Sequence, residues 1–502
     1  MTEFRETDIF SINDKGGFTE KYRHIVYSDE LEETSDLIVD KTFNNTLELI
    51  SDFPYAYDTV ADMQADTSLH EGDVCHTLGF HAAGDGGAAW YTISDTGTAN
   101  GMDVIACGDL FANLVIECNT AILEQFGAYG NSSHDDTAVL NYANETGLNI
   151  YGAKEYYVDK PVFSGTGKRI EINKIHLLNS DSVVTFQNCA KFDVDIIEIA
   201  GQQYAIDIVA NSGAVQLNNF RILAVFATQK CVSFKYTTGV NEWINENVFD
   251  IRLLNTGSSR LGYGFAVESQ IAAVTSSLFN RNVFVNCDFE NVKYGIVAES
   301  GSYVSSCVFD NLRCLEIPSN CFMIKGNGGT MRQCIFRPKT QIKWNQIIDS
   351  SSTFGTAEYT DRNTVDCMIA TSGGRTIAKS AFFTYGNSLL TLSYNVDTAA
   401  SVYLSSDIDL TGVKAPLEYK LAYLSSNVTI TLDPALYNYN GLAYLPICFQ
   451  KTSASATQVT LVIGTETKTL SISGVANYNT FSIVIFRGSV VTVANGIAIM
   501  CA

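Results

Sequence analysis

A six-residue motif recurs in the middle of this chain and limits the folds that the chain can adopt. CDFENV at residues 287–292 returns twenty residues later as CVFDNL at 307–312, and more weakly as CIFRPK at 334–339. Upstream, IRLLNT at 251–256 fits the same template. Coils of roughly 20–36 residues that stack like side chains on like are typical of a parallel β-helix. The repeat therefore predicts a β-solenoid for residues 119–370.

The spacing within the motif predicts which side chains point into the solenoid. Because side chains alternate sides along a strand, Cys287 and Phe289 are expected to point inward, with Asp288 and Glu290 outward. The same register gives two inward columns across successive coils: Ile251, Cys287, Cys307 and Cys334, with Leu253, Phe289, Phe309 and Phe336 beside them. We expect a hydrophobic core built from such columns.

Three asparagines share one further position in this register. Asn255, Asn291 and Asn311 each lie two residues past the apolar pair of their strand. Stacked asparagines at a coil corner can hydrogen-bond one another and satisfy the amides of the turn. The alternative is that each is an ordinary polar turn residue. We expect the ladder, because the apolar positions agree in the same register.

Composition and charge exclude several classes of function. A chain of 502 residues, 46% hydrophobic and 17% charged, suits several buried cores or a repeat architecture. Val, Ile, Thr, Tyr and Phe recur in short runs, which predicts an all-β fold. The net charge of −22 repels phosphate backbones and anionic membranes. No run approaches the ~20 apolar residues that cross a bilayer. We therefore expect neither nucleic-acid binding nor membrane insertion.

The cysteines and the N-terminal residues indicate the cellular compartment in which the chain folds. The 13 cysteines are scattered, with no CxxC pair and no Cys/His cluster at zinc spacing. We expect reduced thiols that act as small core hydrophobes, with no metal site and no cofactor. The opening MTEFRETDIFSINDKGG has neither the basic n-region nor the apolar h-region of a signal peptide. Folding in a reducing cytoplasm is the expectation.

Changes in local composition along the sequence predict four parts. Residues 1–50 are polar and acidic and are interpreted as an arm or attachment segment. Residues 51–118 hold short β runs with a glycine cluster, and residues 119–370 carry the repeats. Residues 371–502 contain closely spaced β runs such as SLLTLSYNV and QVTLVIG. That last pattern is typical of a β-sandwich or jelly roll.

The stretch that begins the repeats resembles a known family. FGAYG at 126–130 is followed by DDTAVLNYAN, a short helix whose Asp135, Asp136 and Thr137 can accept the free amide hydrogens of its first turn. This is similar to the start of pectate-lyase-like right-handed parallel β-helices, where a FGAxGDG turn precedes TDDT and a capping helix. The chain matches at Phe126, Gly127, Ala128, Gly130, Asp135, Asp136 and Thr137, and departs from the pattern at Asn131 and Ser132.

A second stretch, residues 59–93, resembles a module of bacteriophage tailspikes and related virion proteins. The matching landmarks are Val60, Met63, Leu69, Gly72, Asp73, Val74, Gly84, Asp85, Gly86, Gly87 and Tyr91. The resemblance implies a homotrimer of β-helices, an N-terminal part attached to other virion tail proteins, and a C-terminal β-domain that trimerises or binds sugar. It also implies a place in the phage tail after folding in the host cytoplasm, and a bacterial surface polysaccharide as partner.

Paired carboxylates would give such a spike a glycan-cleaving site. Glycosidic cleavage uses two carboxylates, at ~5–5.5 Å for retention or ~6.5–9.5 Å for inversion. The register of the repeat puts Glu290 and Asp310 in adjacent outward positions on neighbouring coils, where strands lie ~4.8 Å apart. Arg337 follows in the same row and could hold a substrate carboxylate. The alternative is a solvated row of charges, or one buried between subunits.

NEWINEN at 241–247 is the second candidate. Trp243 lies between Glu242 and Glu246 just before a β-helix strand. An exposed indole stacks on sugar rings, and nearby carboxylates bind hydroxyls or act on the bond. We assign Trp243 and Glu242 to substrate binding and Glu246 to catalysis. The alternative is that Trp243 packs its loop onto the wall of the solenoid.

Three functions fit these observations. The first is a tailspike that binds and depolymerises a bacterial surface polysaccharide, as a hydrolase or a lyase. The second is a non-catalytic receptor-binding or structural appendage with the same fold. The third is a bacterial polysaccharide lyase or hydrolase. The sequence favours a phage protein but does not identify the glycan.

Overall fold

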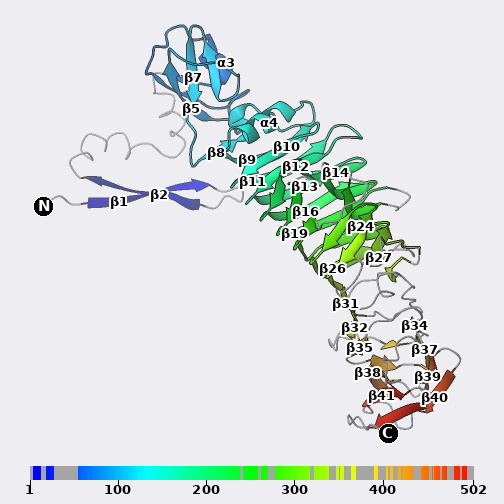
Figure 1. Ribbon diagram of the computed structural model, residues 1–502. Helices are drawn as coiled ribbons and strands as arrows, with labels where there is room; N and C mark the ends of the chain where they lie inside the picture. Colours follow the sequence, from blue (N-terminus) through cyan, green and yellow to red (C-terminus); the bar gives the residue numbers. More distant parts are fainter. Residues whose placement is uncertain are drawn as a thin grey trace. The chain divides into compact units, whose positions relative to one another are not determined.

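The computed structural model describes residues 4–12, 18–27, 55–237, 241–257, 262–269, 278–316, 322–338, 346–349, 351–354 and 363–368, with the strands and a few adjoining residues between 389 and 494. The chain divides into two compact units, Met1–Val115 and Ile116–Ala502. Their regular structure is almost all β (Figure 1). No helix in the described part is long and apolar enough to span a bilayer.

The first unit contains a hairpin and a five-stranded sheet. Strands β1 (Phe4–Ile12) and β2 (Phe18–Tyr27) pair antiparallel. The sheet, in the order β3-β4-β5-β7-β6, consists of β3 (Ala56–Tyr57), β4 (Val74–Thr77), β5 (Ala89–Ser94), β6 (Val104–Cys107) and β7 (Leu110–Leu114). Helix α3 (Val60–Ala65) begins at Thr59, whose Oγ1 accepts the amide of Asp62. A small β module is present, as predicted.

The second unit begins with a capped helix. After β8 (Thr120–Ile122) and the 3₁₀ helix η2 (Leu123–Phe126), helix α4 spans Thr137–Glu145. Asp135 Oδ1 accepts the amide of Thr137 at 2.9 Å, as predicted for this one of the three residues. The N-cap residue is Asp136, whose side chain makes no capping hydrogen bond to the helix, and the Thr137 hydroxyl accepts the amide of Asp159. Asp136 instead accepts the amides of Tyr129 (2.8 Å) and Gly130 (3.0 Å), so its carboxylate ties the preceding turn to the helix. Gly130 has φ +61°, and a Cβ there would lie 2.5 Å from the Lys154 side chain.

A parallel β-helix follows, as the repeat predicts (Figure 1). Sheet 1 is one long parallel face formed by β8, β9 (Asn149–Val158), β11 (Arg169–Leu177), β13 (Asp193–Ala200), β16 (Asn219–Ala227), β19 (Val248–Asn255), β22 (Val283–Val285), β23 (Asp288–Glu290), β26 (Val308–Glu316), β29 (Ile335–Pro338), β31 (Thr364–Met368), β32 (Leu389–Ser393) and β35 (Leu417–Tyr419).

Sheet 2 has two branches that meet at β12. The long branch contains β10 (Val162–Thr166), β12 (Val184–Ala190), β14 (Tyr204–Ala210), β17 (Lys230–Tyr236), β20 (Tyr263–Ser269), β24 (Tyr294–Glu299), β27 (Phe322–Asn327) and β30 (Gln346–Ile348). The short branch contains β15 (Ala214–Gln216), β18 (Trp243–Asn245), β21 (Phe279–Asn280), β25 (Tyr303–Ser305) and β28 (Thr330–Arg332). Each coil passes through the long branch, the short branch and sheet 1 in turn.

A column of phenylalanines on successive strands of sheet 1 fills the core. Its members are buried register partners: Phe220, Phe249, Phe284, Phe309 and Phe336. Neighbouring ring centroids lie 4.6–5.1 Å apart. Such a stack buries a large apolar area on every coil and favours one register over its neighbours.

This column corrects the predicted register. Phe309 stacks on Phe284, whereas Phe289 pairs with Leu253 and with Cys314. The partners Asn286 and Asn311 are 25 residues apart, so this coil is longer than the twenty-residue spacing of the motif. Asn286, at φ 53°, lies between β22 and β23. The CDF motif at 287–289 therefore comes after the left-handed residue Asn286, while CVF at 307–309 comes before Asn311, the residue that corresponds to Asn286 on the next coil.

An asparagine ladder exists, but other residues form it. Asn218 Nδ2 donates to Asn247 Oδ1 (2.8 Å), and Asn247 Nδ2 donates to Asn282 Oδ1 (2.9 Å). All three are buried, and each follows a corner residue with φ of 53–58°: Leu217, Glu246 and Arg281. The ladder predicted from Asn255, Asn291 and Asn311 is wrong, because Asn255 donates to the Thr228 carbonyl and Asn311 to Asn286 Oδ1.

Parallel pairing continues past residue 370 through β32 and β35. Two smaller sheets follow: β33 (Tyr403–Leu404), β36 (Ala422–Leu424), β38 (Leu442–Lys451), β41 (Thr480–Phe486) and β42 (Ser489–Ala494) in one, with β34 (Ile408–Leu410), β37 (Val428–Leu432), β39 (Gln458–Ile463) and β40 (Glu466–Ser471) in the other. Antiparallel pairing enters at β38–β41, β41–β42 and β39–β40. The domain boundary at residue 370 stays a prediction.

Candidate functional site

The outer face of sheet 1 separates the two carboxylates that the motif predicts to be adjacent. Asp310 is the register partner of Val285 and Arg337, while Glu290 is the partner of Leu254 and Glu316. Glu290 and Asp310 therefore occupy different rows of the sheet. The predicted Glu290–Asp310 pair is wrong, and its cause is the register error described above. The predicted proximity of Asp310 and exposed Arg337 is confirmed.

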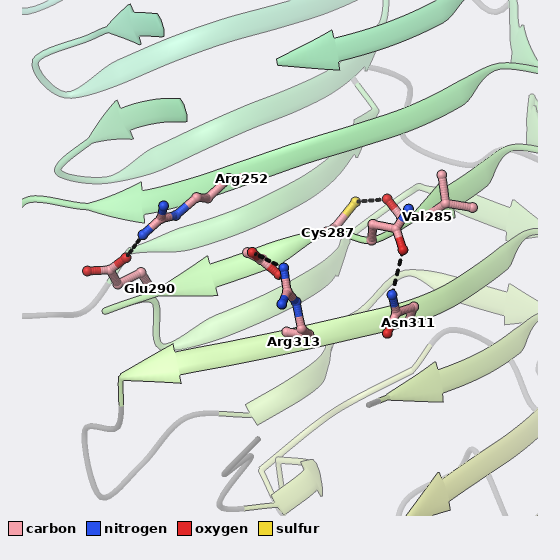
Figure 2. Close-up of polar contacts among 8 residues, drawn as sticks. Arg252, Val285, Cys287, Glu290, Asn311 and Arg313 are labelled. Atoms are coloured by element: carbon pink, nitrogen blue, oxygen red, sulfur yellow. Dashed lines mark hydrogen bonds and ion pairs between the residues drawn. The ribbon is translucent and has the colours of Figure 1, made fainter. Parts of the chain in front are cut away.

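Glu290 is instead part of a network of ion pairs (Figure 2). Arg252 Nη2 lies 2.8 Å from Glu290 Oε2, and on the neighbouring strand Arg313 binds Asp288 through both its Nε and Nη2. Asp288 is 7% exposed, so this bidentate pair is largely removed from water. Each carboxylate is matched by an arginine, which favours an architectural role for these charges.

Glu242 is buried and its carboxylate is occupied. It is 0% exposed, and its oxygens accept the amides of Ser212 (2.8 Å) and Thr237 (2.9 Å) and the Thr237 hydroxyl (2.9 Å). A carboxylate enclosed in this way fixes the backbone of two neighbouring coils. The assignment of Glu242 to sugar binding is therefore not supported by its position.

Trp243 and Glu246 lie at the corner between the short branch and sheet 1. The Trp243 side chain is 38% exposed, as a sugar-stacking residue requires. Glu246 has φ 58°, and its Oε1 lies 3.1 Å from Arg281 Nη1. The catalytic role of Glu246 and the binding role of Trp243 stay predictions.

A different set of charged residues comes together on the outer face of the long branch of sheet 2. A row of mostly short side chains runs along the solenoid across register-paired strands: Asp207, Ser233, Ala266, Val297 and Lys325. The three middle members are at most 2% exposed. The term "sheet-2 strip" denotes this row with its flanking residues Lys230, Lys235, Tyr263, Glu268, Lys293 and Tyr294.

Two short ion pairs occupy one end of the sheet-2 strip. Lys235 Nζ lies 2.7 Å from Asp207 Oδ2, and Lys230 Nζ lies 2.7 Å from Glu268 Oε1. Lys235 is also the register partner of Glu268, so Asp207 and Glu268 lie on opposite sides of its strand. All four side chains are only 14–28% exposed. The fold thus holds two half-buried carboxyl groups on the two strands that flank β17.

The two carboxyl groups differ in their surroundings. Burial raises the pKa of Asp207 above its ordinary value, and the negative charge of Glu268 acts in the same direction. Lys235 and Lys230 oppose this shift without cancelling it. For Lys230, the hydrogen bond to Glu268 raises the pKa although burial acts to lower it. Asp207 therefore keeps its proton to a higher pH than an exposed aspartate, while Glu268 is held in an ion pair.

This contrast gives the site its chemical capacity. A carboxyl group with a raised pKa can donate a proton to a leaving oxygen, and a neighbouring carboxylate can activate water or attack directly. The described residues contain no group of three or more His, Cys, Asp or Glu side chains placed to hold a metal ion. Proton transfer to and from a bound substrate or water is the chemistry that two such carboxyl groups offer.

The sequence carries a signal for this site that motif matching missed. Three seven-residue strands, YAIDIVA at 204–210, KCVSFKY at 230–236 and YGFAVES at 263–269, begin with a tyrosine or lysine and place a polar residue at the fourth or sixth position. Alignment of these strands would have placed Asp207, Lys235 and Glu268 on one outer face. Their apolar positions differ too much to form a visible repeat.

No protein-family model and no curated protein sequence matches the chain. Similar solved structures include the enzymatically active domain of tailspike protein 2 from bacteriophage CBA120, at 11% identity and TM-score 0.42, covering 88% of this chain and 67% of that one. The chain spans 61% of the full-length tailspike protein 2.

Two further solved structures illustrate the range of similar proteins. One is tailspike gp49 of Acinetobacter baumannii bacteriophage Fri1, a capsular polysaccharide depolymerase, at 13% identity and TM-score 0.30, covering 86% of this chain and 81% of that one. The other is PfbA, a surface adhesin of Streptococcus pneumoniae, at 12% identity and TM-score 0.35, covering 75% and 99%. At such identities the likeness concerns the fold alone, and the β-helix of this chain is established by its own strand pairing.

Proposed function

We propose that this chain is a phage tailspike that binds a bacterial surface polysaccharide and cleaves it at the sheet-2 strip. The observation that carries the proposal is the pair of half-buried carboxyl groups, Asp207 and Glu268, held by Lys235 and Lys230 on the outer face of the strands that flank β17; the raised pKa of Asp207, caused first by burial, agrees with it. The tailspike-like landmarks at residues 59–93 and the β-helix that follows them support the phage context.

The proposed reaction is hydrolysis of a glycosidic bond. Asp207 donates its proton to the bridging oxygen as the bond to the anomeric carbon breaks. Glu268 either removes a proton from the attacking water, with inversion, or attacks the anomeric carbon itself and is released by water in a second step, with retention. Lys230 and Lys235 hold the two carboxyl groups in place. Water supplies the hydroxyl in both cases, so the reaction needs no further reactant.

The remaining assignments are part of the same proposal. Residues 1–50 would attach the protein to other tail proteins, residues 371–502 would trimerise or bind sugar, and three copies would assemble. Location in the virion after folding in the host cytoplasm belongs to the same proposal. Trp243 would add a sugar-stacking contact outside the cleavage site, and this exposed indole is the observation that favours the alternative, a receptor-binding spike that cuts nothing.

Incubation of the full chain with capsular and O-antigen polysaccharides, with detection of new reducing ends, tests the proposal. Wild-type protein should release oligosaccharides, and Asp207→Asn or Glu268→Gln should slow release about 10²–10⁴-fold, the usual contribution of a general acid or base. Asp310→Asn is the matched control, because it removes an outward carboxylate of sheet 1. Equal rates for Asp207→Asn and the control would refute the site. Binding without cleavage by the wild type would support the receptor-binding alternative.

A further inference from the structure

Lysines and aromatic rings lie together along one edge of the sheet-2 strip. Register pairing aligns five residues on successive strands: Tyr204, Lys230, Tyr263, Tyr294 and Phe322. Lys230 Nζ lies 5.7 Å from the centre of the Tyr263 ring, and Lys293 Nζ and Lys325 Nζ lie 5.1 Å and 5.8 Å from the centre of the Tyr294 ring. This gathering of ammonium groups stands out in a chain of net charge −22.

The rings of this edge are engaged with one another. The centres of Tyr263 and Tyr294 lie 5.5 Å apart in an edge-to-face arrangement, and those of Tyr294 and Phe322 lie 5.7 Å apart in a stacked one. Ammonium groups over the tyrosine rings take up further ring surface. The ring faces are therefore poorly placed to stack on a sugar. The Tyr294 hydroxyl is hydrogen-bonded to Asp349, so this edge offers a ligand mainly its ammonium groups.

Lys293 differs from the other lysines of the strip. Lys230 is paired with Glu268, Lys235 with Asp207, and Lys325 with Asp349 at 3.3 Å. Lys293 is half-buried and forms no ion pair with any carboxylate of the described residues. Among the described residues, its ammonium group lies against the ring of Tyr294, a weaker partner than a carboxylate.

The position of Lys293 relates it to the proposed cleavage pair. Lys293 immediately precedes β24, and β24 pairs with β20, the strand that carries Glu268. Adjacent strands lie ~4.8 Å apart, and Tyr294 pairs with Tyr263, five residues before Glu268 on β20. Lys293 therefore lies one coil beyond Glu268 and toward the beginning of the strands, where a glycan that crosses the strip obliquely from Glu268 would meet it. A carboxylate on that part of the glycan would meet an ammonium group that pairs with no carboxylate of the described residues.

We propose that Lys293 and Tyr294 form a subsite for a carboxylate-bearing sugar, so that the polysaccharide taken by the strip is an acidic one of uronic-acid or sialic-acid type. The inference rests on the proposed function for the direction of the glycan. The Lys293 ammonium binds the sugar carboxylate, and the Tyr294 ring holds the ammonium from the other side. An ammonium is a compact point charge, so this contact selects for charge more than for the shape of the sugar.

Binding of defined oligosaccharides to the full chain tests the subsite. The probes are a galacturonic acid trimer, a hyaluronan tetrasaccharide and an α2,8-linked sialic acid trimer, each compared with its carboxyl-reduced form by saturation-transfer NMR titration. At least one acidic probe should bind at least tenfold more tightly than its reduced form. Lys293→Gln should remove that preference, Lys293→Arg should retain it, and Lys191→Gln, which changes an exposed lysine at a solenoid corner, should leave it intact.

The failure of this inference can be told apart from failure of the proposed function. Acidic and reduced probes of equal affinity, or a preference that survives Lys293→Gln, would overturn the acidic subsite even if the protein cleaves a glycan. An acidic preference that Lys293→Gln removes would support the subsite even if Asp207→Asn has no effect on cleavage. Asp207→Asn itself should keep the preference, because Asp207 pairs with Lys235 whereas Lys293 lies against the Tyr294 ring.

Discussion

The buried asparagine ladder offers a demanding test of the register, and Asn247 is its central member. Asn247 Oδ1 accepts the amide of Asn218 (3.1 Å) and its Nδ2 (2.8 Å), while Asn247 Nδ2 donates to the Val215 carbonyl (3.1 Å) and to Asn282 Oδ1 (2.9 Å). Asn247 and Asn282 are 0% exposed and Asn218 is 2% exposed. Water cannot replace these bonds without entering the core.

Asn247→Ala should therefore be strongly destabilising. The change leaves two buried donors without their acceptor: the Asn218 amide and one hydrogen of its Nδ2. Asn282 Oδ1 keeps the backbone amide of residue 247 as a donor at 3.1 Å. Each unsatisfied buried group costs about 1–3 kcal/mol, so the total loss should be at least about 2 kcal/mol.

Thermal unfolding followed by circular dichroism, with hydrogen exchange of coil amides, measures this effect. Asn173→Ala is the control, because Asn173 is half-buried and its Nδ2 makes a solvent-exposed hydrogen bond of 3.2 Å to the Ala153 carbonyl, so its loss should cost less than about 1 kcal/mol. Asn247→Ala should lower the melting temperature clearly further and increase exchange in the neighbouring coils. Equal effects of the two substitutions would refute the ladder and the register on which it depends.

Three further predictions follow from packing and pKa. Phe284→Ala should destabilise the solenoid by about 3–5 kcal/mol in thermal unfolding, since it breaks the buried column of rings; a loss below about 1 kcal/mol would contradict that packing. Burial raises the pKa of Asp136. Its proton therefore stabilises the fold below the unfolded pKa of about 4, and this contribution is lost as pH rises through the folded pKa. The wild type should lose stability relative to Asp136→Asn over that rise, and a constant difference in stability between the two proteins would count against the prediction. If Asp207 is the general acid, the rate of cleavage should fall as pH rises through the raised pKa of Asp207. Lys235→Met removes a charge that lowers this pKa, so it should move the falling limb of the pH–rate profile to higher pH. A limb that does not move would exclude that role for Asp207.

The sequence predicted the architecture well because the alternation of side chains along strands and the composition of turns reveal the repeat. The capped helix at Asp135 and the Leu253–Phe289 and Phe309–Phe336 contacts are all present. These features depend on local chemistry or on pairs of coils whose register agrees with the spacing of the motif. They need no knowledge of the loops between strands.

The exact register needed information that the motif does not carry. One coil contains Asn286 in a left-handed conformation between β22 and β23, and this shifts the CDF motif past the bend. The more informative repeat was a shorter one, NVF at 247–249 and 282–284 with CVF at 307–309, whose first member points into the core. This error in the predicted register left the prediction of a solenoid correct, but it placed Asp310 next to Glu290, although the structure separates them.

The candidate site shows the same limit. Asp207 and Glu268 come from strands whose shared pattern is only a polar residue in an outward position, and two intervening crossovers separate them in the sequence. Their relation depends on the pairing of β14, β17 and β20. Burial of Glu242 likewise depends on a backbone turn at Ser212, one coil away.

Cleavage at the sheet-2 strip can be checked by a crystal structure of the Asp207→Asn protein with a bound oligosaccharide from its polysaccharide. We expect a glycan lying along the sheet-2 strip, with a glycosidic oxygen within hydrogen-bonding distance of residue 207 and Glu268 on the other side of the bond. A glycan on the outer face of sheet 1 between Arg252 and Arg337, or at the Trp243 corner with the strip empty, would contradict it.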